Sequence, residues 1–320
     1  MTSALRSSGC LDHDAFVYAS EDEFAECLTP LLVHALGRGR PAVAVVPKAN
    51  AQLLADTLGD DAARVSFVEA DGWYRHPAET IGAYDRMLRT FPEDAEPFVI
   101  GEVQFGETPR DWLAWTRYES ALNRSLQDHR AHVVCPYDKR TLPASVVDAA
   151  LRTHPHLLAA GERSESSVYA EPEVLLPVLT FAWDAPQRPP EVDLVVKGNT
   201  DSVRRAFRRA ALAAGFEPDR VEELTLALNE IVTNALVHGG GQAHLRTWVS
   251  PEGVTCVVDD EGPGVDDALL GYRPPAPDAV RGYGMWLARR IFDDLDARRT
   301  AGGGLSVVLD ARNNRPLPPH

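Results

Sequence analysis

Short apolar runs alternate with amphipathic stretches through the first half of the chain. The run at 42–46 (AVAVV) is typical of a strand buried on both faces of a parallel sheet. Gly37 and Gly39 end the amphipathic stretch before it, as glycines commonly end helices. We expect strands at 16–19, 42–46, 65–68, 98–103 and 131–135, and helices at 22–36, 50–58, 80–90, 111–128 and 144–152. This alternation predicts an α/β domain whose parallel sheet is covered by helices on both faces.

The pattern weakens at 155–183, where we expect only a strand-like stretch near 167–169 and a short segment at 173–180. Residues 184–191 (DAPQRPPE) contain three prolines, each of which fixes φ and lacks an N–H donor. Such a segment is typical of a stiff linker. We therefore predict a first domain at 10–183, a linker at 184–191 and a second domain at 192–312.

The second domain has a different order of elements, with fewer crossovers. We expect strands at 192–196, 243–249, 253–259 and 305–311, and helices at 200–214, 219–237 and 285–294. We expect an α+β fold for this domain. The helix at 219–237 is apolar on several faces and should be largely buried. Its apolar residues are Leu224, Leu226, Leu228, Ile231, Val232 and Leu236.

Composition and charge restrict the classes of function. The 320 residues carry a net charge of −15 without a basic stripe, which argues against a nucleic-acid ligand. The N-terminus lacks the apolar segment of a secretion signal, and the longest apolar runs are too short to span a bilayer. The four cysteines are scattered without a CxxC motif. We expect a cytoplasmic protein without a membrane contact.

Potential metal ligands that lie close in the sequence do not form a zinc motif. His132 and Cys135 are three apart on a predicted strand, so their side chains point to opposite faces. Cys27 and His34 share a helix face, but no further ligand lies near them in the sequence. We expect no structural zinc site.

The second domain contains a polar pair on its longest predicted helix. Glu230 and Asn234 lie four residues apart, so they share one face of that helix. Buried carboxylates and amides need a polar partner, and a metal-bound triphosphate is one candidate. The pair alone equally fits an amphipathic helix with a polar stripe.

Two glycine motifs follow this pair. Asp260-x-Gly262-x-Gly264 ends an apolar strand; its carboxylate can accept from the adenine amine, and its glycines let the backbone pass close to a base. Gly282-x-Gly284 leads into a helix, whose first N–H groups can bind phosphate. Each motif alone also fits an ordinary turn or helix entry. Three such motifs in order within one domain favour a nucleotide site.

The ordered motifs resemble the ATP site of the GHKL superfamily, whose fold is the Bergerat ATP-binding sandwich. The resemblance covers residues 192–311 and implies ATP and Mg²⁺ as cofactors. It implies that Asn234 coordinates Mg²⁺, that Glu230 acts as general base or polarises the attacking group, and that Asp260 reads adenine. His238 matches a less universal member of the first motif, or only caps the helix end. The remaining matches, which shape the pocket and its lid, are Gly262, Gly264, Gly282 and Gly284.

Two segments place the chain within this superfamily. Residues 223–239 (ELTLALNEIVTNALVHG) resemble the anti-sigma-factor serine kinases, and the lid at 265–281 is short, as in that branch. Residues 302–306 (GGGLS) stand where many members have a Gly-Thr pair; the Thr is absent, which leaves that contact open. Members of the branch phosphorylate a Ser or Thr on an anti-anti-sigma (STAS-type) protein and often bind a sigma factor.

The resemblance predicts an anti-sigma regulator with ATP-dependent serine/threonine kinase activity. One alternative is a non-catalytic, ATP-dependent partner switch. Another is an atypical sensor histidine kinase, but no phosphoacceptor hairpin is visible, since Pro155 breaks any helix through His154 and His156. Homodimer formation stays open.

The first domain resembles the MEDS (DcmR-like) sensory domain in residues 13–18 (HDAFVY), the acidic helix after them, and residues 39–46 (GRPAVAVV). The resemblance implies a RecA-like sheet, and we expect an unidentified small-molecule signal there to gate the kinase. No P-loop motif occurs. Ligand pockets of such sheets lie at the carboxyl ends of the strands, where Glu102 and Asp138 are predicted. Two interpretations stay open: the two acids line such a pocket, or they are exposed acids at the ends of strands. Exposed acids are the more common arrangement.

Overall fold

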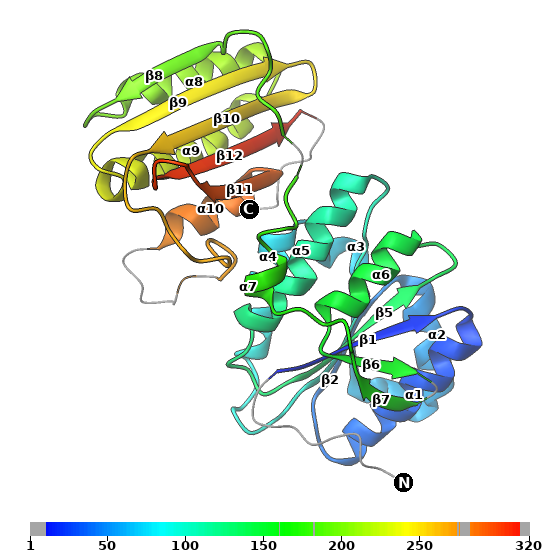
Figure 1. Cartoon of the computed structure of the whole chain (residues 1–320). Coiled ribbons are helices and arrows are strands. Elements are labelled where there is room, and N and C mark those ends of the chain that lie inside the picture. Colours follow the sequence, from blue (N-terminus) through cyan, green and yellow to red (C-terminus); the bar gives the residue numbers. More distant parts are fainter. Residues whose placement is uncertain (1–10, 160, 182, 274, 276–281, 314–320) are drawn as a thin grey trace. The chain divides into compact units, whose positions relative to one another are not determined.

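The computed structural model describes residues 11–159, 161–181, 183–273, 275 and 282–313. The chain divides into two compact units, Met1–Leu179 and Thr180–His320, which are described separately (Figure 1).

The first unit is a mixed sheet with helices on both faces. Its elements are β1 (Asp12–Tyr18), α1 (Glu21–Gly37), β2 (Ala42–Val46), α2 (Lys48–Leu58), the 3-10 helix η1 (Gly59–Arg64), β3 (Val65–Glu69), α3 (Ala70–Trp73), α4 (Pro77–Leu88), β4 (Phe98–Gly101), α5 (Pro109–Ser125), β5 (His132–Asp138), α6 (Ala144–Thr153), β6 (His156–Ala159), β7 (Glu162–Glu165) and α7 (Pro172–Leu175). The strand order is β3-β2-β4-β5-β1-β6-β7. All neighbouring pairs are parallel except β6 and β7.

The predicted α/β class is confirmed, and β7 adds an antiparallel edge strand that the sequence did not predict. β7 pairs antiparallel with β6, whereas a strand near 167–169 was expected. β7 reads Glu-Arg-Ser-Glu and is mostly exposed, so no apolar alternation marks it.

Side chains of β1 and β5 alternate between the two faces of the sheet. Phe16 and Val134 lie in one apolar cluster with the residues of α1 and α2. His13 and Cys135 point to the opposite face, where they meet side chains of α5. The α5 helix is fixed at its start by a capping box, in which the Thr108 hydroxyl accepts from the Asp111 N–H, 3.2 Å away, and the Asp111 side chain accepts in return.

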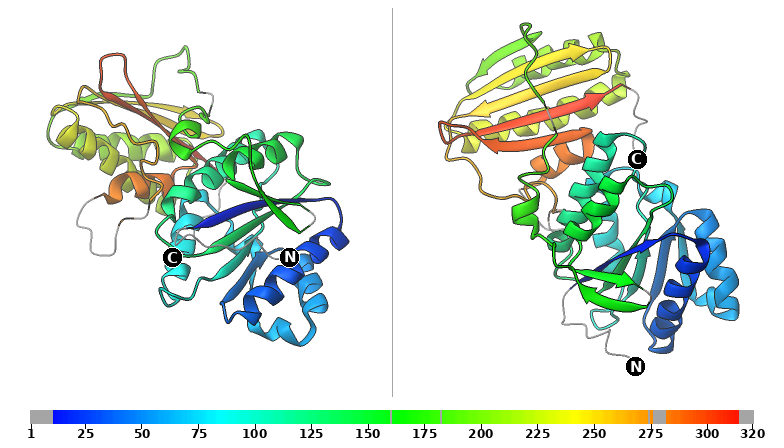
Figure 2. Two further views of the ribbon diagram at one scale, coloured as in Figure 1. Left: turned by 60° about the horizontal axis from the view of Figure 1, so that its bottom comes forward. Right: turned by 45° about the vertical axis from the view of Figure 1, so that its right-hand side comes forward.

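The second unit is an antiparallel sheet with three helices on one face (Figures 1 and 2). Its elements are β8 (Val192–Val196), α8 (Asp201–Ala213), α9 (Pro218–His238), β9 (Ala243–Ser250), β10 (Gly253–Asp260), α10 (Tyr283–Ile291), β11 (Asp294–Arg299) and β12 (Leu305–Arg312). The strand order is β11-β12-β10-β9-β8. The predicted two-layer sandwich is confirmed, and β11 is a strand that the sequence analysis did not predict.

The core of the second unit lies between its helices and one face of its sheet. Phe207 of α8, Leu228 of α9 and Phe292 after α10 are fully buried there against β-strand residues such as Leu245 and Leu309. The helix α9 is largely buried, as expected, but Leu226 is 54% exposed. The helix therefore has one solvent face, as an amphipathic helix on a sheet normally has.

The proline-rich segment and the residues before it contact the second unit. The Phe181 N–H donates to Asp296 Oδ2, 3.1 Å away, and the Trp183 ring meets the Trp248 ring at 5.6 Å. The Trp248 indole N–H donates to the Arg188 carbonyl, 3.1 Å away. Through these contacts, Phe181, Trp183 and Arg188 lie against the side of the sheet away from the three helices.

Candidate nucleotide-binding site

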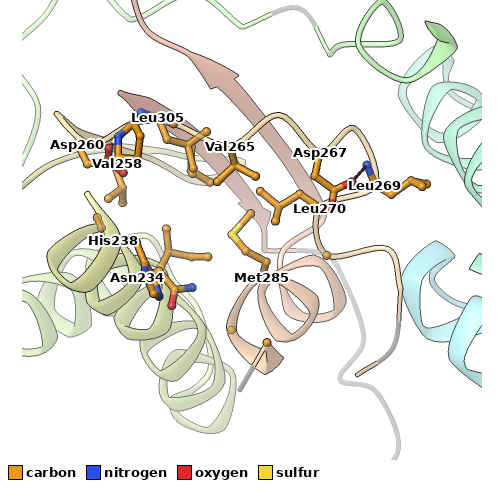
Figure 3. Close-up of a pocket in the computed structure, with 18 of the residues that line it drawn as sticks. Asn234, His238, Val258, Asp260, Val265, Asp267, Leu269, Leu270, Met285 and Leu305 are labelled. Carbon is orange, nitrogen blue, oxygen red and sulfur yellow. Dashed lines mark hydrogen bonds between the residues drawn. The ribbon is translucent and has the colours of Figure 1, made fainter. Parts of the chain in front are cut away.

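A pocket of about 410 Å³ opens between α9, β10, α10 and β12 of the second unit (Figure 3). This volume lies within the range of small-molecule sites. Six of the predicted residues line it, namely Asn234, His238, Asp260, Gly264, Gly282 and Gly284. Glu230 and Gly262 are not in its lining but lie directly beside lining residues, as described below.

The walls of the pocket are mainly apolar. Ile231 comes from α9, Val258 from β10, Met285 from α10, and Leu305 and Val307 from β12. Asp260 stands at one end of this apolar surface, next to Leu305, and Asn234 faces the pocket from α9 (Figure 3). An apolar slot with a few convergent polar groups is the usual form of a site for a flat organic ring.

Main-chain groups hold the Asp260 carboxylate in place. Its Oδ1 accepts from the Gly262 N–H, 2.9 Å away, and from the Leu305 N–H, 3.1 Å away. Within the described part of the chain, its Oδ2 makes no hydrogen bond. One carboxylate oxygen is thus fixed by the backbone, and the other can accept from a ligand.

The backbone around Asp260 is packed so closely that two neighbouring positions require glycine. A Cβ atom at Gly304 would lie 1.9 Å from the Asp260 carbonyl oxygen, and one at Gly239 would lie 2.4 Å from Asp260 Cβ. From the sequence, Gly239 was expected only to end the helix at 219–237, and Gly304 was considered only in the Gly-Thr comparison. The signal was available for both, because each lies next to a named motif.

Glu230 and Asn234 meet the start of α10. A Cβ atom at Gly284 would lie 2.9 Å from Asn234 Nδ2 and 3.4 Å from Glu230 Oε2. A larger residue at position 284 would therefore have to displace the side chains of the polar pair of α9. Both residues are half-buried, so the sequence-predicted pair does share one face of the helix, and that face adjoins the pocket.

The first turn of α10 is open toward the pocket. Its N-cap is Gly282, whose φ of 95° lies in the left-handed region that favours glycine, and no side chain caps the helix there. The first N–H groups of a helix lack intrahelical partners and carry partial positive charge. They can bind an anion that reaches the pocket.

His238 is the last residue of α9 and is exposed, although it also lines the pocket. It makes no side-chain hydrogen bond among the residues that the structure describes. The lid predicted at 265–281 lies partly outside the described residues. Its described part includes Leu269 and Leu270, which line the pocket, and Asp267, whose Oδ1 accepts from the Leu269 N–H, 2.9 Å away.

In the first unit, Glu102 and Asp138 lie at the carboxyl ends of neighbouring strands in different surroundings. Glu102 is buried, so the exposed-acid alternative is wrong for it; it accepts from the Tyr18 hydroxyl at 2.8 Å and from Asn50 Nδ2 at 2.7 Å. Burial raises the pKa of Glu102 despite these two donors. The hydrogen bonds from Arg140 lower the pKa of Asp138, against a smaller opposing effect of burial.

Comparison with known proteins assigns both units to families. Residues 12–155 match the MEDS family (methanogen/methylotroph, DcmR sensory domain), and residues 197–310 match the histidine kinase-like ATPase domain. The protein therefore combines a MEDS sensory domain with a histidine kinase-like ATPase domain, which confirms both resemblances.

Individual relatives match the second unit. An anti-sigma F factor of Clostridium beijerinckii is 28% identical over 127 residues, which cover 35% of this chain and 89% of the relative. Anti-sigma F factors of Thermoanaerobacter pseudethanolicus (27% over 129 residues; 37% and 90%) and Clostridium novyi (25% over 122 residues; 34% and 85%) are also similar.

Among the described residues, no helix combines the length and the apolar character that crossing a bilayer requires.

Proposed function

We propose that the protein is an ATP-binding anti-sigma regulator with serine/threonine kinase activity, gated by its MEDS domain. The observation that carries the proposal is the Asp260 carboxylate at the end of an apolar pocket. The main chain fixes its Oδ1, and its Oδ2 is open to a ligand. The similarity of residues in this unit to anti-sigma F factors supports the regulatory role.

Adenine fits the apolar end of the pocket. Its exocyclic amine is a donor, and a carboxylate is an acceptor only, so Asp260 Oδ2 pairs with an amine and rejects the carbonyl that guanine has in that place. The apolar walls formed by Ile231, Val258 and Val307 suit the two faces of a flat base.

The triphosphate then lies toward α9 and α10. Asn234 offers an amide oxygen, a ligand type that Mg²⁺ accepts together with phosphate oxygens and water. The close approach of Gly284 to Asn234 brings the anion-binding turn of α10 beside this amide. The bound ion would neutralise charge on the phosphates during transfer. Glu230, within one helical turn, would accept the proton of the attacking hydroxyl.

The partners follow from the class of the relatives. We propose a sigma factor as the binding partner and an anti-anti-sigma protein of the STAS type as the acceptor of the phosphoryl group. The net charge of −15 favours a partner with a basic surface. A small molecule bound by the MEDS domain would supply the signal, provided that it binds the active and inactive states with different affinity.

The test is phosphoryl transfer from radiolabelled ATP to a serine-containing partner captured from native lysate. Glu230→Ala should keep Mg²⁺-ATP binding and lose transfer by about 10²–10⁴-fold, because it removes the base but not the adenine or metal contacts. Glu222→Ala on the same helix is the matched control, since Glu222 is exposed and, among the described residues, forms an ion pair with Arg208 on the protein surface. Normal transfer by Glu230→Ala would place the base elsewhere.

Two other outcomes distinguish the alternatives. ATP-dependent capture of the partner without transfer would indicate a binding module that switches partners without catalysis. An acid-labile phosphoryl group on this chain itself would indicate histidine autophosphorylation.

A further inference from the structure

Four side chains with metal-binding atoms meet in the interior of the first unit. They are His13 of β1, Glu119 of α5, Cys135 of β5 and His154, which directly follows α6. Their exposed fractions are 1%, 1%, 4% and 0%. One ligand atom from each lies within 4.8 Å of all the others. Four buried polar groups at one point in an apolar core require an explanation.

The separations of these atoms match those of a tetrahedral metal shell. His13 Nε2 lies 3.2 Å from Cys135 Sγ and 3.3 Å from Glu119 Oε2. His154 Nε2 lies 3.6 Å from Glu119 Oε2, and Cys135 Sγ lies 3.8 Å from the same oxygen. With Zn–N and Zn–O near 2.0 Å and Zn–S near 2.3 Å, neighbouring tetrahedral ligands are about 3.3–3.6 Å apart. Four of the six separations thus lie within a few tenths of an ångström of those around a tetrahedral ion, and the other two are no more than 4.8 Å.

Hydrogen bonding among the four residues is incomplete. Among the residues that the structure describes, His154 Nε2 and Glu119 Oε1 are buried and find no hydrogen-bond partner. Buried polar atoms are nearly always paired, so an unpaired nitrogen that faces a carboxylate oxygen and a thiol points to a ligand between them.

Both imidazole rings are held from behind in the orientation that a metal ligand needs. His13 Nδ1 donates to Asn123 Oδ1, 3.0 Å away, and His154 Nδ1 donates to the Ala150 carbonyl, 2.9 Å away. Asn123 is itself fixed, because its Nδ2 donates to the Thr153 carbonyl at 2.8 Å. Metal-binding histidines commonly donate their second N–H to such a group, which leaves Nε2 for the ion.

We propose that these four residues bind one Zn²⁺ ion in the MEDS domain. One thiolate, one carboxylate and two neutral imidazoles carry two negative charges, which a divalent ion neutralises in the buried site. Cysteine, histidine and carboxylate ligands in a tetrahedral arrangement are those that Zn²⁺ takes. The ion would join β1, β5, α5 and the end of α6. This inference is independent of the nucleotide site.

The test begins with the metal content of the full-length chain by plasma mass spectrometry, followed by exchange of the bound ion for Co²⁺. We expect about one zinc per chain, and an intense thiolate-to-cobalt charge-transfer band with the visible bands of a tetrahedral ion. A thiolate band separates this site from Mg²⁺ binding at the nucleotide pocket, where no cysteine lies in the described lining.

Two variants and one control sharpen this test. Cys135→Ser should abolish the charge-transfer band, and Asn123→Ala, which keeps all four ligands, should weaken metal affinity about 10–100-fold. Cys27→Ser is the matched control, because Cys27 is also buried in the first unit but lies outside the cluster. A wild-type chain that contains no zinc and gives no charge-transfer band with Co²⁺ would overturn the proposal. A band that persists in Cys135→Ser would do the same.

Discussion

Two carboxylates of this chain, Asp260 and Asp14, accept hydrogen bonds from different kinds of donor. Main-chain N–H groups fix one oxygen of Asp260 and leave the other open, as a ligand-reading residue requires. Asp14 is fully buried and is enclosed by side-chain donors: His132 Nε2 lies 2.8 Å from its Oδ2, and Arg163 binds its Oδ1 at 2.9 Å. Asp14 therefore serves the stability of the first unit and is closed to a ligand.

The partners of Asp14 lead us to predict how the stability of the first unit depends on pH. Burial alone would raise the pKa of Asp14, but its hydrogen bonds to His132 and Arg163 and their charges outweigh burial and lower it below 3.8. A lowered folded-state pKa gives stability that is present above pH 3.8 and is lost as the pH falls through the folded-state value. Asp14→Asn should cost about 3 kcal/mol at neutral pH, because it removes the carboxylate that meets His132 and Arg163, although Arg163 keeps its ion pair with Asp12.

Urea unfolding at pH 7 and at successively lower pH measures this effect. The difference in unfolding free energy between the wild type and Asp14→Asn should become smaller as the pH falls. Asp138→Asn is the control, since Asp138 pairs with the half-exposed Arg140 and should contribute less than about 1 kcal/mol. Equal losses of stability in the two variants would contradict the role assigned to Asp14. A stability difference for Asp14→Asn that does not change with pH would do so too.

The close packing at the start of β12 leads to a prediction about the nucleotide site. Gly304 packs against the Asp260 carbonyl, so Gly304→Ala forces β12 away from β10 and misplaces the Leu305 N–H that holds Asp260. We expect a loss of about 1–3 kcal/mol in stability, typical of overpacking, together with weaker ATP binding. Gly302→Ala is the control, because the nearest atom to its Cβ would be Thr300 Oγ1 at 3.8 Å. Thermal unfolding and nucleotide titration check both variants, and similar behaviour of the two would show that the contact at Gly304 is unimportant.

Elements with a clear apolar pattern could be predicted, and those without one could not. β2 reads AVAVV and is buried throughout, as expected. β11 reads DLDARR; Asp294 and Asp296 are buried in it together with Leu295, so polar residues occupy positions that the pattern assigns to the surface. Besides the nearby Arg298, Asp296 accepts from the N–H of Phe181, a partner far along the chain that is not visible in the local sequence.

The nucleotide site could be predicted from the sequence, whereas the proposed zinc site could not. The nucleotide motifs could be found because each is a short run with fixed spacing. The opposite orientation of His132 and Cys135 is confirmed, since His132 meets Asp14 and Cys135 meets His13. The expectation of no zinc considered only neighbours in the sequence, whereas the four proposed ligands come from separate elements between positions 13 and 154. The parallel register of β1 and β5 brings His13 and Cys135 together, and the packing of α5 and the end of α6 on the sheet adds the other two ligands.

The division of the chain into two units leads to a prediction about isolated fragments. A fragment of residues 180–320 should fold alone and bind ATP as the full chain does, because every described lining residue of the pocket lies within it. A fragment of residues 190–320 should also bind ATP but be less stable by about 1.5–3 kcal/mol, since it loses the buried Phe181 ring.

Both fragments should have a fixed activity, while the full chain responds to its signal, because the MEDS domain is absent from them. Urea unfolding and nucleotide titration of the two fragments provide the measurement. A 180–320 fragment that is insoluble or does not bind ATP would show that the second unit depends on the first.

The most direct test of the central claim is calorimetric titration of the full-length chain with Mg²⁺-ATP and Mg²⁺-GTP. The control is Asp259→Asn, because the neighbouring Asp259 side chain pairs with Arg246 instead of meeting the pocket. We predict that the wild-type chain and Asp259→Asn bind ATP equally and prefer it to GTP. Asp260→Asn should weaken ATP binding by about 1–3 kcal/mol, or roughly 5- to 150-fold in Kd. Equal ATP affinity in Asp260→Asn and the wild type, or no ATP binding by the wild type, would contradict the account.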